Sequence, residues 1–107
     1  MNAEPGERRQ RVVHYFDCTW VSQWGPIQAR LSNISPTGCY VDSRFTVPAL
    51  GEIVENITVT PNGEHPLVLH GTVIDSMRGI GFAVRFAQLE DEARERLSAL
   101  LQSRQRG

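Results

Sequence analysis

Short segments in which apolar and polar residues alternate, followed by one change to helical spacing, constrain the fold of this chain most. In the clearest segment, Ile27, Ala29 and Leu31 alternate with polar neighbours, which is the period-2 pattern of a half-buried strand. Residues 12–21 are rich in β-branched and aromatic side chains, which also favours a strand. The predicted strands lie at residues 12–21, 27–31, 39–41, 53–60, 67–75 and 79–86.

The end of the chain shows where the period changes. The segment 79–86 is expected to turn four apolar side chains to one face: Ile80, Phe82, Val84 and Phe86. Apolar residues then recur at helical spacing, at Leu89, Ala93, Leu97 and Leu100 or Leu101. Acidic residues at 90–92 would lie in the first turn of this helix, and Arg104 and Arg106 would follow its end. Both placements suit the helix dipole.

Six strands and one terminal helix define the expected organisation. Closing the strands into a barrel removes their exposed edges, so we expect a mainly β protein with the helix at an end or on a side. Residues 1–11 are polar and would form a flexible N-terminal arm, residues 12–103 the barrel domain with its helix, and residues 104–107 a tail. An Asn62–Gly63 pair predicts a hairpin turn between two strands.

Charge and hydropathy narrow the classes of partner. The net charge is −1, which argues against a large basic face for a nucleic-acid polymer. No run approaches the roughly 18 apolar residues that indicate a membrane span, and the first residues lack the apolar centre of a secretory signal. We therefore expect a soluble, cytoplasmic protein that binds neither a nucleic-acid polymer nor a membrane.

No set of residues points to catalysis or to a metal. Cys18 and Cys39 form no C-x-x-C pair and the three histidines are scattered, whereas a structural zinc site needs about four grouped ligands. Ser35 lacks the G-x-S-x-G elbow of a hydrolase nucleophile. Helix capping accounts for the acidic residues 90–92. We therefore expect no enzymatic activity, no metal, no cofactor, and two reduced structural thiols.

An arginine cluster in the arm is the first candidate binding feature. Arg8, Arg9 and Arg11 carry planar guanidinium groups, which can clamp phosphate and stack over bases. All eleven basic residues of the chain are arginines, so every cation has this shape. A solvated basic tail is the alternative interpretation of the cluster.

The second feature is an N-x-S-x-x-G sequence that interrupts the alternation, formed by Asn33, Ser35 and Gly38. The Asn33 amide can both donate and accept, as a guanine edge requires, and Ser35 adds a rotatable hydroxyl. Gly38 permits a positive φ and removes the Cβ that would block close approach. An Asx-turn between two strands explains the same residues equally well.

The order of these features resembles the PilZ domain family from about residue 7 to residue 101. The arginine cluster precedes the N-x-S-x-x-G, which precedes the segment G-I-G-F-A-V-R-F and a terminal helix. That family is a six-stranded antiparallel β-barrel with a C-terminal α-helix, and its signature is an R-x-x-x-R arm with a [D/N]-x-S-x-x-G turn. The turn is matched in full, whereas Arg8 and Arg11 are one residue closer together than the family's pair.

The resemblance implies a bacterial receptor for the second messenger cyclic di-GMP, linked to motility, biofilm formation or surface polysaccharide. The arm would become ordered over the nucleotide, its arginines on phosphates and guanine, while the turn holds a guanine edge. The ligand site would then comprise Arg8, Arg9, Arg11, Asn33, Ser35 and Gly38. A downstream protein partner would read the change, and the chain itself would be a monomer or a weak homodimer.

A nucleotide-independent adaptor is the alternative function. Some PilZ relatives that lack the full arginine motif act by protein contact, including in pilus assembly. Exposed aromatic side chains are typical anchors of such interfaces, and the candidates are Trp20, Trp24, Tyr40 and Phe45. Trp20 is equally suited to the core.

Overall fold

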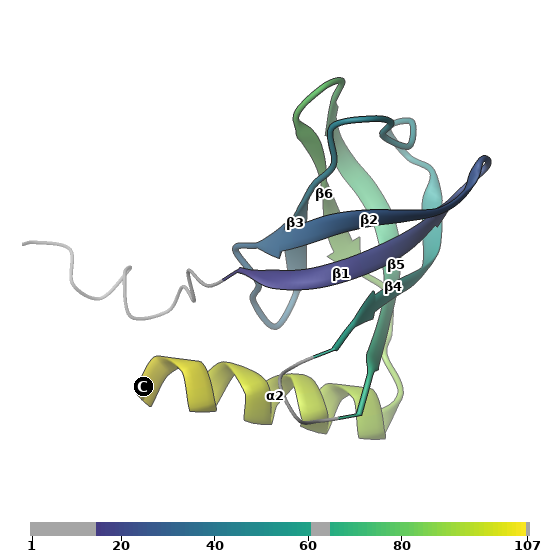
Figure 1. The fold of residues 1–107 in the computed structure, drawn as a ribbon. Coiled ribbons are helices and arrows are strands. Elements are labelled where there is room, and N and C mark those ends of the chain that lie inside the picture. Colours follow the sequence, from purple (N-terminus) through teal and green to yellow (C-terminus); the bar gives the residue numbers. More distant parts are fainter. Residues whose placement is uncertain (1–14, 61–64, 107) are drawn as a thin grey trace, which may run out of the picture.

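The computed structural model describes residues 15–60 and 65–106. It contains six strands and one helix (Figure 1), namely β1 (Phe16–Ser22), β2 (Gly25–Ser32), β3 (Gly38–Asp42), β4 (Ile53–Val59), β5 (Leu67–Met77), β6 (Gly81–Phe86) and α2 (Asp91–Arg106). The predicted first strand began at residue 12, but Tyr15 precedes β1 and residues 12–14 lie outside the described part of the chain. The Asn62–Gly63 turn expected between β4 and β5 also lies outside it.

The strands form a closed antiparallel barrel in the order β1-β2-β3-β6-β5-β4, with β1 and β4 paired to complete it. This confirms the predicted fold. Closure gives every strand two neighbours, so no whole strand edge is left free to pair with another chain. Two pairings, between β3 and β6 and between β1 and β4, join strands that are not consecutive in the sequence.

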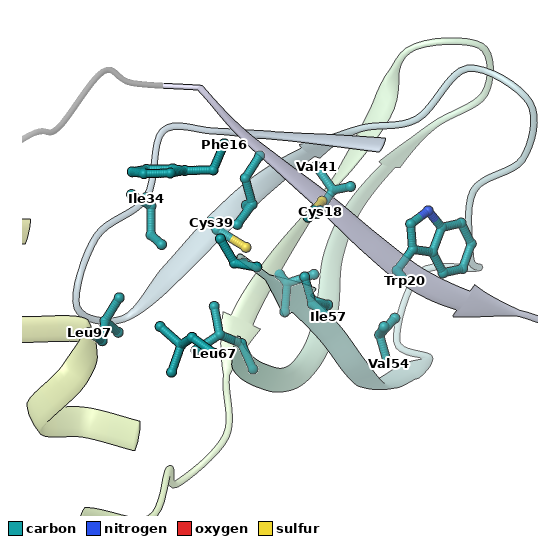
Figure 2. Close-up of a cluster of buried hydrophobic side chains, with 14 of the residues drawn as sticks. Phe16, Cys18, Trp20, Ile34, Cys39, Val41, Val54, Ile57, Leu67 and Leu97 are labelled. Atoms are coloured by element: carbon teal, nitrogen blue, oxygen red, sulfur yellow. The ribbon is translucent and has the colours of Figure 1, made fainter. Parts of the chain in front are cut away.

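The period-2 pattern explains the core. Phe16, Cys18 and Trp20 of β1 are all buried and alternate with more exposed residues. Trp20 is only 2% exposed, and its ring meets Phe82 edge-on at a centroid distance of 5.0 Å. Its indole N–H donates to the hydroxyl of the buried Ser43 at 3.2 Å, which satisfies its one polar atom. Trp20 is therefore a core residue rather than an interface anchor (Figure 2).

The expectation that four apolar residues of 79–86 share a face is wrong at its first member. Strand β6 begins at Gly81, and only Phe82 and Val84 are fully buried, with Phe86 packed at the margin of the core. Ile80 instead lies in the turn before the strand, where its N–H donates to the carbonyl of Met77, and it is 53% exposed. The cause is Gly79, whose φ of 82° reverses the chain two residues before β6 begins at Gly81.

Helix α2 lies across one end of the barrel (Figure 1). Its predicted apolar stripe is confirmed, because Leu97, Leu100 and Leu101 are buried with Leu89 just before the helix. Arg96 donates to the carbonyl oxygens of Pro66, at 2.8 Å, and His65, which fixes the helix to the start of β5. The helix runs to residue 106, so the two C-terminal arginines lie in its last turn rather than after it. Within the described residues, no helix is long and apolar enough to cross a bilayer.

The two cysteines are free thiols inside the barrel. Burial, with a smaller contribution from Asp17 and Asp42, raises the pKa of Cys18 to about 12, and burial also raises the pKa of Cys39. Both side chains therefore stay protonated and act as small apolar groups at neutral pH. In the part of the chain that the structure describes, no three His, Cys, Asp or Glu residues are grouped as metal ligands.

Candidate functional site

The N-x-S-x-x-G sequence forms the turn between β2 and β3. Asn33 follows the last residue of β2 and has a φ of 52°, in the left-handed region where asparagine is among the few tolerated side chains. The positive φ expected at Gly38 is therefore at Asn33 instead. The Asn33 side chain is exposed and has no hydrogen-bond partner among the described residues. Within the described residues, nothing occupies its amide.

Ser35 shapes this turn. Its hydroxyl oxygen accepts the backbone N–H groups of Thr37 and Gly38, each at 3.3 Å, and its hydroxyl donates to the carbonyl of Gly38 at 3.3 Å. Its own backbone N–H donates to the same carbonyl at 2.9 Å. The side chain and the backbone of Ser35 together hold the turn closed at the start of β3, without a ligand.

Gly38 is required by the approach of two strands. A Cβ atom at this position would lie 2.3 Å from the carbonyl oxygen of Val84, which is a backbone atom of β6 that cannot turn aside. Gly38 is paired with Arg85 in the β3–β6 ladder, so the missing side chain leaves the surface beside Arg85 open. The structure thus gives Gly38 a different reason from the predicted one, because the group that approaches it closely is the backbone of β6. Its expected place in a ligand site stays a prediction.

The turn borders a cavity of about 430 Å³ on the outer surface of β3 and β6, which we call the turn cavity. Gly38 of β3 and Ala83 of β6 are small residues of its lining. Tyr40, Ile74 and Arg85 are larger lining residues, from β3, β5 and β6. The full lining is Asn33, Ile34, Ser35, Thr37, Gly38, Cys39, Tyr40, Ile74, Ala83, Val84 and Arg85. Burial, followed by the charges of Asp42 and Asp75, raises the pKa of Tyr40, so its phenol keeps a proton to donate.

Arg85 is the one charged residue that lines the turn cavity among the described residues. It is exposed and forms no ion pair within residues 15–60 and 65–106. Sequence reasoning missed it. The alternation of β6 does place Arg85 on the outer face, between Val84 and Phe86, but only the pairing of β6 with β3 reveals that this face adjoins the turn.

The chain enters strand β1 next to the same turn. Phe16 pairs with Leu31, two residues before Asn33, so the backbone that leads into β1 arrives beside the end of β2. The ring of Tyr15 lies under the guanidinium of Arg30, with 4.6 Å between the Arg30 Cζ atom and the ring centroid. The remaining predicted site residues, Arg8, Arg9 and Arg11, lie outside the described part of the chain.

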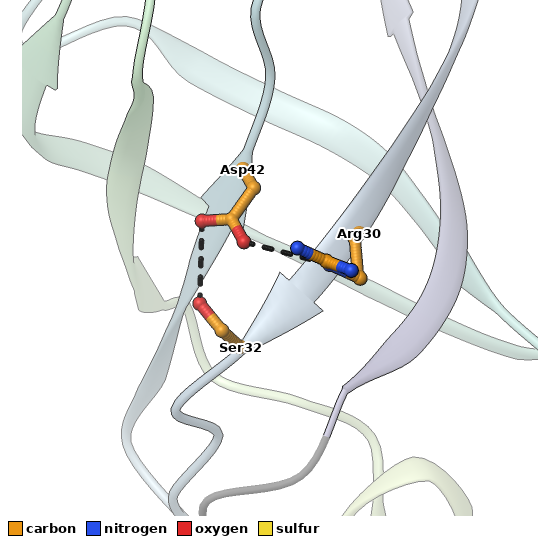
Figure 3. A network of polar contacts seen from close by, with 3 residues as sticks. All are labelled: Arg30, Ser32 and Asp42. Carbon is orange, nitrogen blue, oxygen red and sulfur yellow. Dashed lines mark hydrogen bonds and ion pairs between the residues drawn. The ribbon is translucent and has the colours of Figure 1, made fainter.

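Arg30 belongs to a polar network between β2 and β3 (Figure 3). Its Nε atom lies 3.7 Å from a carboxylate oxygen of Asp42, and the Ser32 hydroxyl donates to the other oxygen at 3.4 Å. Both partners of the ion pair are partly exposed, so solvent weakens it, and a pair of this kind stabilises a fold by about 0–1 kcal/mol. The more important effect of the network is that the Arg30 guanidinium already has a partner, the carboxylate of Asp42.

A second hollow lies on the other side of that network, and we call it the β2 groove. It measures about 780 Å³ and is lined by Asp17, Gln28, Ala29, Arg30, Asp42, Arg44, Phe45, Gly79 and Ile80. Strand β2 pairs with β3 only from Arg30 to Ser32, so its first half adjoins the groove and pairs with β1 alone. Phe45 is 91% exposed at this groove. Two arginines and two aspartates line it, so their formal charges cancel.

A closed six-stranded barrel with a helix across one end, and a ligand-sized cavity beside an N-x-S-x-x-G turn, defines a small binding domain. Comparison with known protein families matches residues 7–103 to the PilZ domain. The chain belongs to the PilZ domain family.

Solved structures give the same fold. Two structures of MrkH from K. pneumonia, one of them in its apo state, align over 97% of this chain with TM-scores of 0.69 and 0.70 at 15% sequence identity. A third structure, of MrkH described as a c-di-GMP-dependent transcription regulatory factor, aligns over 84% of the chain with a TM-score of 0.64 and 13% identity. The chain spans about half the length of MrkH, since it covers 50%, 52% and 45% of those three chains. No curated protein sequence matches the chain.

Proposed function

We propose that this domain is a receptor for cyclic di-GMP, bound at the turn cavity and covered by the N-terminal arm. The observation that carries the proposal is the register of Phe16 with Leu31, which brings the chain into the barrel beside Asn33. An arm attached at this position needs no long connection to reach the cavity. Membership of the PilZ family and the c-di-GMP dependence of MrkH support the same ligand.

Each described residue of the site has a separate task in this proposal. The Asn33 amide, exposed and without a partner among the described residues, pairs with a guanine edge. Ser35 holds the turn that presents Asn33, and Gly38 leaves the surface clear for a flat base. Tyr40 and Ile74 then provide apolar contacts at the side of that base.

The arm provides most of the positive charge in this proposal. Arg8, Arg9 and Arg11 contact the phosphates and stack on guanine, and these charge-assisted contacts are stronger than neutral hydrogen bonds. They must offset the entropy of ordering the arm, at about 1–2 kcal/mol for each backbone residue fixed. Binding then changes the arm from a loose to an ordered segment, and a downstream protein reads that change.

Titration calorimetry with cyclic di-GMP on the full chain tests the proposal. We expect binding at micromolar concentration or tighter, and loss of binding when Arg8→Ala and Arg11→Ala are combined. Arg78→Ala is the matched control, because Arg78 is an exposed arginine that lines neither the turn cavity nor the β2 groove. A folded wild-type chain that gives no heat at millimolar ligand would overturn the proposal.

The second candidate function is a nucleotide-independent adaptor that binds another protein. Phe45 favours it, because an aromatic side chain that is 91% exposed beside a groove is typical of an interface anchor. Trp24 is also exposed, at 75%, whereas Tyr40 is half-buried at the turn cavity. The first half of β2 pairs with β1 but, among the described residues, has no partner on its other edge. That edge favours an extended peptide segment as the occupant, since such a segment can pair with a strand edge. Calorimetry without heat, on a folded chain, would favour this function over the first.

A further inference from the structure

We propose that Arg85 is a phosphate-binding residue of the turn cavity. This inference rests on the proposed function, because it assumes that the cavity takes a cyclic dinucleotide. It adds a cation on β6 that the arginine arm and the N-x-S-x-x-G turn do not include.

The backbone around Arg85 is fixed to the turn itself. Gly38 and Arg85 are paired in the β3–β6 ladder. One residue further, the N–H of Phe86 donates to the carbonyl oxygen of Thr37 at 2.8 Å. Arg85 is therefore held beside the turn by bonds on the backbone, while the side chains of Val84 and Phe86 point into the barrel and leave Arg85 on its surface.

Nothing in the described part of the chain engages the Arg85 guanidinium. Its two ladder neighbours are Gly38, which has no side chain, and Thr72, which has no charge. No carboxylate lines the turn cavity within the described residues. Three of the described arginines are occupied: Arg30 by Tyr15 and Asp42, Arg94 by Asp91, and Arg96 by two carbonyl groups. Within the described residues, Arg44, Arg78 and Arg85 form no hydrogen bond or ion pair, and of these three only Arg85 lines the turn cavity. As far as the described residues go, Arg85 keeps its five N–H donors for a ligand.

The chemistry of the cavity assigns Arg85 to phosphate rather than to a base. A guanidinium fork matches two phosphate oxygens, and such charge-assisted contacts are strongest where no competing anion is present. The groups that suit a base are elsewhere on the lining: the Asn33 amide for an edge, and Tyr40 and Ile74 for the faces. An anionic ligand seated there needs a cation, and the described lining contains one.

The strand order sets Arg85 apart from the start of β1. Around the barrel the order is β1, β2, β3, β6, so the β2–β3 turn lies between the first residue of β1 and the strand that carries Arg85. Arg85 would therefore contact a phosphate on the β6 side of the turn.

Calorimetry on the full chain at two salt concentrations tests the role of Arg85, with cyclic di-GMP as the probe. We expect Arg85→Ala to weaken binding by about 10- to 100-fold, the range for a lost charge-assisted contact, and to make the affinity less sensitive to salt, because one phosphate contact is gone. Arg85→Lys should recover part of the affinity, since it keeps the charge but not the fork. Arg78→Ala should match the wild type.

The outcomes separate the two proposals. Wild-type binding that Arg85→Ala leaves unchanged would overturn this inference and leave the receptor function standing. Weaker binding with an unchanged salt dependence would overturn the assignment to phosphate. A wild-type chain that binds no nucleotide would overturn the receptor function and this inference together. Thermal unfolding of each variant checks the fold, and Arg85→Gln replaces Arg85→Ala if the smaller side chain unfolds the protein.

Discussion

The turn cavity and the β2 groove both border strand β3, yet they offer a ligand different chemistry. The cavity presents the Asn33 amide and the Arg85 guanidinium, and within the described residues neither has a hydrogen-bond or ion-pair partner and no carboxylate lines the cavity. The groove holds two arginines and two aspartates, and one pair of these, Arg30 with Asp42, already forms an ion pair.

This difference indicates that one small barrel can offer two separate binding surfaces, each suited to a different class of ligand. A cation beside hydrogen-bonding groups suits a compact anionic ligand, because charge-assisted contacts to such a ligand are stronger than neutral hydrogen bonds. Balanced charges around an exposed Phe45 and an open strand edge suit a polypeptide, which is neutral on average and brings its own backbone donors and acceptors. The predictions below test whether the two regions are independent.

The largest effect is expected from Gly38→Ala, which should remove the turn cavity without touching the groove. The added Cβ would lie 2.3 Å from a backbone oxygen of β6, so the two strands must separate. We expect a loss of about 3 kcal/mol in the free energy of unfolding, measured by urea denaturation, together with loss of nucleotide binding. Thr72→Ala, an exposed change on the neighbouring strand β5, should stay within about 0.5 kcal/mol of the wild type. Equal stability of the two variants would contradict the close contact.

An intermediate effect is expected from Asn33→Gly, which should affect binding alone. Glycine adopts the φ of 52° without strain, so the turn keeps its shape while the amide is removed. We expect cyclic di-GMP to bind about tenfold more weakly or worse by calorimetry, which is the loss of one or two hydrogen bonds, with the unfolding temperature unchanged. Asn56→Ala on β4 is the control, because Asn56 is also an exposed asparagine but lines neither region. Unchanged binding in Asn33→Gly would remove Asn33 from the site.

The smallest effect is expected from Phe45→Ser, which changes the groove. Phe45 is almost fully exposed, so its loss should alter the free energy of unfolding by no more than about 0.5 kcal/mol. If the two regions are independent, the affinity for cyclic di-GMP stays within about twofold of the wild type. A clear loss of nucleotide affinity in this variant, measured in the same titration, would show that the groove and the cavity form one site.

The sequence predicts the elements of this fold well because alternation reports burial directly. The role of Trp20 could not be predicted from residue type, because tryptophan suits a core and an interface equally. Its position in β1, on the same face as Phe16 and Cys18, assigns it to the core. Ile80 was misplaced because a glycine turn delays the start of β6 by two residues, from the predicted 79 to Gly81.

The site is less predictable because it depends on pairings between distant segments. The sequence marked Gly38 as a special position, but a positive φ and a close contact both favour glycine and cannot be told apart from the sequence. The structure assigns the close contact to Gly38 and the positive φ to Asn33. Arg85 could not be linked to the turn, because β3 and β6 are separated by two other strands in the sequence. The roles of the three arm arginines remain predictions from the sequence.

The hydrogen bond from the Phe86 N–H to the Thr37 carbonyl oxygen connects the β2–β3 turn with the C-terminal part of the chain. It fastens the rim of the turn to the end of β6, and the next residue, Ala87, is in turn fastened to His70 of β5. Helix α2 starts only four residues after Ala87. The turn is therefore joined to the start of the helix by a short length of chain that backbone hydrogen bonds hold at two consecutive residues.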